Sequence, residues 1–132
     1  NKTRVVAARF DWVHSIESEK VARRLSEARL DAQAPLNVLI QVNVSGEASK
    51  SGVAPAAVPA LAAAVAALPR LRLRGLMAIP EPGAGAARYR ALKALFDQLA
   101  PLGADTLSVG MSDDMELAIA EGSTMVRVGT AI

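Results

Sequence analysis

Apolar runs and amphipathic stretches alternate along this chain, and the alternation restricts the possible folds more than any other feature. Residues 36–44 are almost continuous in Val, Ile and Leu, which is typical of a strand buried on both faces of a parallel sheet. Residues 17–30 instead place Val21, Leu25 and Ala28 at helical spacing, opposite a solvated charged face that extends to Arg29. Hydrophobic periodicity predicts five strands, at residues 12–16, 36–44, 71–79, 106–109 and 125–128.

Helices are predicted around these strands, at residues 2–9, 17–30, 55–68, 86–102 and 113–121. Strands that recur every ~25–35 residues with helices between them indicate βαβ units and an α/β fold. This alternation fits either a doubly wound sheet or a (β/α)8 TIM barrel, and both folds place ligands at the carboxyl ends of the strands. A complete barrel usually needs ~250 residues, so the length of 132 residues by itself favours a doubly wound domain.

Composition excludes several classes of protein. The chain has no cysteine, so it has no disulfide, no thiolate nucleophile and no Cys-ligated metal, and we expect a reducing, cytoplasmic location. No run reaches the ~18–20 apolar residues of a membrane span, so we expect no membrane partner. Basic and acidic residues are interspersed around a net charge of +2, and a nucleic-acid partner is not expected either.

Two neighbouring strand ends carry the residues best suited to an anion site. Gly110 and Ser112 lie where a predicted strand gives way to a helix, and free backbone N–H groups at a helix start attract anions. Gly129 and Thr130 follow the next strand, so both ends offer N–H and hydroxyl donors to one point. Arg127 precedes Gly129 by two residues and faces the same side of the sheet, where burial requires an acidic or ligand partner. For Ser112, capping of its own helix is the simpler alternative.

Two other features have simple structural explanations. His14 is the only histidine, and no acid–base constellation accompanies it, so we expect a core histidine rather than a catalytic base. Asp113, Asp114 and Glu116 lie at a predicted helix start, where acids interact favourably with the helix dipole. A metal site is therefore not expected.

Three motifs in a fixed order carry a resemblance to a known family. They are Gly-Leu-Met-Ala-Ile-Pro at residues 75–80, Gly-Met-Ser-Asp-Asp-Met-Glu at residues 110–116, and Arg-Val-Gly-Thr at residues 127–130. Together with Val-His-Ser-Ile at residues 13–16 and the run at residues 37–43, they resemble the pyridoxal phosphate homeostasis protein family over essentially the whole chain. The combination in this order is far more specific than any one motif.

The resemblance implies a TIM barrel like the N-terminal domain of alanine racemase. It implies a protein that binds pyridoxal 5′-phosphate (PLP) and buffers or delivers it without an established turnover reaction, so no residue receives a catalytic role. By position, Ser112, Gly129 and Thr130 match the residues that hold the phosphate in this family. Arg127 matches the arginine that faces the pyridine nitrogen, and Met77 matches a residue that lines the cofactor ring. A PLP-dependent amino-acid racemase and a phosphate-binding α/β domain unrelated to PLP are the alternatives.

One departure from the family concerns its Schiff-base lysine. That lysine lies on an early strand, and none of the lysines of this chain, at positions 2, 20, 50 and 93, matches it. The chain also starts without Met and stops after a strand-like run, so we expect residues 1–132 to be the carboxyl-terminal part of a PLP-binding barrel, without the first strands and the final helix. The strands should then be parallel and adjacent in chain order. Open sheet edges would favour self-association.

Overall fold

Four parallel strands form one sheet in the computed structural model, which describes residues 2–45, 51–81, 83–111 and 114–127. The strands are β1 (Trp12–Ile16), β2 (Leu36–Val42), β3 (Leu71–Ala78) and β4 (Thr106–Ser108). They lie in the order β1-β2-β3-β4, so neighbours in the sheet are also neighbours along the chain. The chain therefore advances across the sheet in one direction, as it does in a barrel.

The segment predicted as a fifth strand continues this order. Met125 forms a parallel bridge with Ser108. Its N–H donates to the Leu107 carbonyl oxygen at 3.1 Å, and its own carbonyl oxygen accepts from the Val109 N–H at 3.2 Å. The predicted parallel arrangement in chain order is confirmed for the described residues, and Val128 lies outside them. The doubly wound alternative is wrong, because such a sheet would reverse its strand order.

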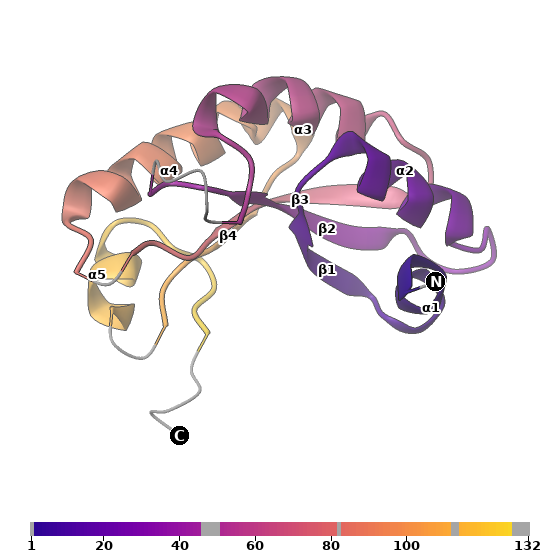
Figure 1. Ribbon diagram of the computed structural model, residues 1–132, viewed down its shortest axis with the longest axis horizontal. Coiled ribbons are helices and arrows are strands. Elements are labelled where there is room, and N and C mark those ends of the chain that lie inside the picture. Colours follow the sequence, from indigo (N-terminus) through magenta and orange to yellow (C-terminus); the bar gives the residue numbers. More distant parts are fainter. Residues whose placement is uncertain (1, 46–50, 82, 112–113, 128–132) are drawn as a thin grey trace.

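Three helices cover one face of the sheet. The helices of the described chain are α1 (Lys2–Arg9), α2 (Glu19–Ala28), α3 (Val58–Ala66), α4 (Ala86–Gln98) and α5 (Met115–Ala120), with short 3-10 turns η1 (Pro55–Ala57) and η2 (Ala100–Leu102). Helices α2, α3 and α4 lie side by side along this face, as Figure 1 shows, and α1 packs against α2. We call the opposite face of the sheet the inner face. Among the described residues, no helix is both long and apolar enough to cross a membrane.

Capping and turn residues explain where helices depart from the predicted boundaries. Helix α2 begins two residues later than predicted, because the Ser18 side chain accepts the Val21 N–H at 3.2 Å and caps it. The helix predicted at residues 55–68 is divided into η1 and α3. The helix predicted at residues 86–102 ends at Gln98, and η2 then stops at Gly103, whose φ of 88° is left-handed.

Strand β2 is buried on both faces, as its sequence predicts. Val38 and Ile40 are fully buried on the helix side, in a cluster that includes Leu25 of α2 and Leu92 of α4. Leu39 points to the inner face and is fully buried there. The core between sheet and helices thus fixes which residues of each strand face inward.

An irregularity in β3 changes which of its side chains face inward. The pairing of β3 with β2 skips one residue, Arg74, between Leu73 and Gly75. Glycine is required beside the skipped residue, because a Cβ at Gly75 would lie 1.8 Å from the Thr106 carbonyl oxygen of β4. Arg74 and Met77 consequently both face inward although they are three residues apart.

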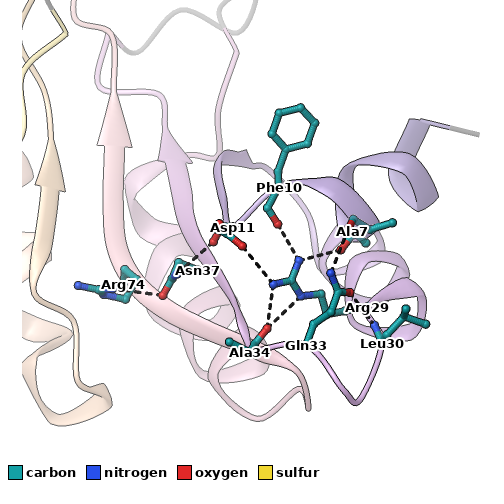
Figure 2. Close-up of polar contacts among 10 residues, drawn as sticks. Ala7, Phe10, Asp11, Arg29, Leu30, Gln33, Ala34, Asn37 and Arg74 are labelled. Carbon is teal, nitrogen blue, oxygen red and sulfur yellow. Dashed lines mark hydrogen bonds and ion pairs between the residues drawn. The ribbon is translucent and has the colours of Figure 1, made fainter.

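Arg29 is buried, which corrects the prediction that the charged face of this helix is solvated throughout. Only 4% of Arg29 is exposed. Its guanidinium donates to the carbonyl oxygens of Ala7 (2.8 Å), Phe10 (2.6 Å) and Ala34 (2.8 and 3.0 Å), as Figure 2 shows. Asp11 is its acidic neighbour at 3.6 Å. The planar guanidinium of Arg29, at the end of α2, thus connects the end of α1 with the residues that precede β2.

We expect Arg29→Lys to lower the free energy of unfolding by about 2–3 kcal/mol, because an ammonium group cannot donate to these three carbonyls with fork geometry. Urea denaturation of the two proteins measures the difference. The matched control is Arg24→Lys at an exposed position of α2, which should change the free energy by less than about 0.5 kcal/mol. Equal effects of the two substitutions would contradict the role given to Arg29.

Candidate functional site

Side chains from three strands form a row on the inner face at the carboxyl ends of the strands. Gln41 of β2 pairs with Met77 of β3, and Met77 pairs with Ser108 of β4. Partners in register point to the same face of a sheet. The three residues are 8%, 7% and 0% exposed, respectively. Met77, which the resemblance assigns to the cofactor ring, therefore lies at the centre of a buried row.

Arg127 lies across the end of this row. Its Nη1 donates to Ser108 Oγ at 2.6 Å and to the Ser108 carbonyl oxygen at 3.2 Å, and its Nη2 donates to the Ala78 carbonyl oxygen at 2.9 Å. A guanidinium has five N–H donors. Among the described residues, Nε and the second Nη2 hydrogen have no partner. The protein thus fixes the position of Arg127 and leaves donors for a ligand.

The charge of Arg127 is not paired with a carboxylate within the described part of the chain. Burial lowers the pKa of Arg127 and the charge of Asp114 opposes this shift, yet the guanidinium stays charged because arginine does not lose its proton in proteins. Its hydrogen-bond acceptors are a hydroxyl and two carbonyl oxygens, all of them neutral. The carboxyl end of the inner face is therefore suited to a ligand with acceptor atoms or negative charge.

His14 lies on the same inner face, on β1. Its ring meets Trp12 edge to face, with 5.8 Å between the ring centroids. The prediction of a core histidine is wrong, because His14 is only half-buried. Burial and, secondarily, the charge of Arg127 lower the pKa of His14, so the imidazole is neutral at pH 7.

The amino end of the inner face is closed by Arg74. Its guanidinium stacks on Trp12, with 4.6 Å from Cζ to the ring centroid. It donates to both carboxylate oxygens of Asp105 at 2.8 Å and to Asn37 Oδ1 at 3.1 Å. The hydrogen bond from Arg74 lowers the pKa of Asp105. Arg74 is thus held on the inner face by Trp12, Asn37 and Asp105, and its charge is paired with that of Asp105.

Asp114, which directly precedes α5, bonds both to Met111 and to Tyr89 of α4. Its Oδ1 accepts the Met111 N–H at 2.6 Å, and its Oδ2 accepts the hydroxyl of Tyr89 from α4. The Asp114 side chain thus bonds to Met111 and Tyr89 and does not cap α5. Three residues are predicted to bind the phosphate, namely Ser112, Gly129 and Thr130, and all three lie outside the described residues. Asp113 lies outside them as well. Capping by Ser112 therefore stays an open alternative.

Several residues of this arrangement were not predicted from the sequence. Gln41 gave a usable signal, because it is the polar residue of the otherwise apolar run at residues 38–42. Ser108 and Tyr89 gave none, because their roles depend on contacts between distant segments. Asp114 and Glu116 do not form part of a metal site within the described ranges, where no group of three or more potential ligands converges.

Comparison with known proteins identifies the family. The family model described as alanine racemase, N-terminal domain, matches residues 2–132. The pyridoxal phosphate homeostasis protein of Pseudomonas aeruginosa is 62% identical over 135 residues, and that of Escherichia coli is 53% identical over 143 residues. Both matches cover 100% of this chain, which spans 59% of the length of each relative.

A solved structure shows the same fold. PipY of Synechococcus elongatus, solved with PLP bound, matches with a TM-score of 0.85 at 33% sequence identity. The match covers 98% of this chain and 64% of that one. The parallel sheet and its helices are thus part of a barrel of the alanine racemase type. The chain belongs to the alanine racemase N-terminal-domain family, as the order of its motifs predicts.

Proposed function

We propose that the protein binds PLP and serves in PLP homeostasis as a non-catalytic carrier or buffer. Two curated relatives carry the name pyridoxal phosphate homeostasis protein, and PipY was solved with PLP bound. The observation that supports the proposal most is Arg127, with donors left for a ligand beside buried Met77. Because the chain spans 59% of these relatives, the proposal concerns the whole protein. A cytoplasmic location and the lack of a nucleic-acid partner stay predictions.

The described residues fit the chemistry of PLP. Met77, which is 7% exposed at the inner face, offers an apolar side chain to an aromatic ring. Arg127 offers N–H donors to a ring nitrogen, which accepts a hydrogen bond when it is unprotonated. Ser112, Gly129 and Thr130 would hold the phosphate with hydroxyl and backbone donors, as the family motifs imply.

The position of Arg127 also helps to distinguish a protein that stores PLP from an enzyme that uses PLP in catalysis. PLP supplies a reactive aldehyde and an electron-withdrawing ring when it is bound. Arginine keeps its protons, so Arg127 cannot protonate the ring nitrogen, and the ring withdraws electrons less strongly. This suits a carrier or a racemase better than a transaminase. The resemblance places the lysine that would hold the aldehyde outside this chain.

We expect Arg127→Gln to weaken PLP binding about tenfold, because a charged donor to the ring is lost. Titration with PLP, followed by the absorption of the bound cofactor in the whole protein, measures the change. The control is Arg72→Gln, which removes an exposed arginine near the start of β3 and should leave the affinity for PLP unchanged. Unaltered PLP affinity in Arg127→Gln would refute the contact between Arg127 and the ring.

A racemase is the second candidate, because the matching family model is described by alanine racemase. We expect the whole protein, saturated with PLP, to interconvert L- and D-alanine no faster than PLP in buffer. Chiral chromatography of the reaction mixture measures both rates. Saturable racemisation that disappears in Arg127→Gln would show that the protein is an enzyme and not a carrier.

Self-association is expected when the 132-residue chain is produced alone. Among the described residues, β1 pairs only with β2, so the other edge of β1 offers unpaired backbone groups. Light scattering measures the molar mass, and a thermal scan measures the cooperativity of unfolding. A monomer that unfolds cooperatively would show that these strands form a self-sufficient core.

A further inference from the structure

Gln41 is a buried amide near the carboxyl end of β2. It is the polar residue of the run at residues 38–42, in which Leu39 and Ile40 are fully buried, and only 8% of Gln41 is exposed. Its pairing with Met77 of β3 places its side chain on the inner face. Its backbone carbonyl oxygen accepts the Val53 N–H at 2.9 Å. The side chain therefore starts from a fixed point of the sheet and faces the same side as Met77.

The carboxamide of Gln41 has no hydrogen-bond partner among the described residues. Within that part of the chain, Glu81 Oε1 is the only side-chain atom that is both fully buried and unpartnered, so both polar atoms of Gln41 are accessible from the inner face. A buried amide without a partner costs free energy of folding, and an apolar side chain of similar length avoids that cost. The packing of the described sheet would thus favour an apolar residue at this position.

Arg127 lies on the other side of Met77. Its Nη2 donates to the carbonyl oxygen of Ala78, the residue that follows Met77, and its Nη1 donates to Ser108, the partner of Met77 on β4. Gln41 and Ser108 thus flank Met77, each at the distance of about 4.8 Å that separates neighbouring strands. A planar ring that lies over Met77 therefore has the guanidinium at one edge and a carboxamide at the other.

The ring of PLP has a polar group for each of these edges. The proposed function assigns its nitrogen to Arg127. The 3-hydroxyl and the phosphate arm lie on opposite sides of the line from this nitrogen to the carbon that bears the aldehyde. The motifs predicted to bind the phosphate follow β4 and Arg127 in the sequence, and β2 lies in the other direction across the sheet. The 3-oxygen then points toward Gln41, whose amide can donate to it or accept from it.

We propose that Gln41 is a specificity-determining residue, and that its carboxamide forms a hydrogen bond with the 3-oxygen of PLP. This inference rests on the proposed function. Met77 and Arg127 suit any flat heterocycle with an acceptor nitrogen. Gln41 adds selectivity for a ring that also carries an oxygen on the side of β2, because a ligand without that oxygen leaves the amide unpaired.

The test compares PLP with 3-deoxypyridoxal 5′-phosphate, in which hydrogen replaces the 3-hydroxyl. Isothermal titration calorimetry measures the dissociation constants of both ligands for the whole protein and for Gln41→Met, which keeps the length of the side chain and removes its amide. We expect PLP binding to weaken about fivefold and binding of the 3-deoxy compound to change less than about twofold. The matched control is Gln98→Met at an exposed position at the end of α4, which should change neither affinity.

Thermal unfolding of the cofactor-free whole protein separates a role in binding from a role in folding. Gln41→Met removes an amide without a described partner, so the melting temperature should stay the same or rise. A lower melting temperature, equal weakening of the two ligands, or unaltered PLP affinity in Gln41→Met would overturn the inference. If the unaltered protein binds neither ligand, the proposed function itself fails.

Discussion

The close approach of β3 and β4 at Gly75 determines which side chains the inner face presents. Side chains alternate along a strand, so residues three positions apart normally face opposite sides. Arg74 and Met77 both face inward because the skipped residue shifts the alternation. Leu73 and Leu76 both pack in the core on the helix side for the same reason. A side chain at position 75 would collide with the backbone of β4, so the inward positions of Arg74 and Met77 both depend on this glycine.

Arg74 and Arg127 are both half-buried and face inward, and they illustrate how its partners decide what such a cation can do. Arg74 binds both oxygens of the Asp105 carboxylate and stacks on Trp12, so its charge is compensated within the protein. Arg127 binds a hydroxyl and carbonyl oxygens, and no carboxylate of the described residues forms an ion pair with it. The first arrangement stabilises the sheet, and the second leaves a cation for a ligand at the end where barrels bind their substrates.

The sequence predicted those features that depend on local pattern. The continuous apolar run of β2 identified a strand buried on both faces, and the spacing in the last motif placed Arg127 on the inner face. Burial of Arg29 could not be predicted, because its acceptors are carbonyl oxygens of segments that approach only in the fold. The same applies to the bond between Tyr89 and Asp114, which joins residues 25 positions apart. Neither the hydrophobic periodicity nor the composition of a sequence indicates which distant residues will pair in this way.

The charge of the site is set by the protein and varies little near neutral pH. Arg127 keeps its proton at all physiological pH values. His14, the histidine on the same face, has a lowered pKa and is already neutral at pH 7, so it adds no charge as the pH rises from there. The hydroxyl of Tyr89 keeps its proton over the same range because its pKa is raised. Arg127, His14 and Tyr89 therefore keep the same charge as the pH rises from 7, and any change in charge over that range originates in other groups.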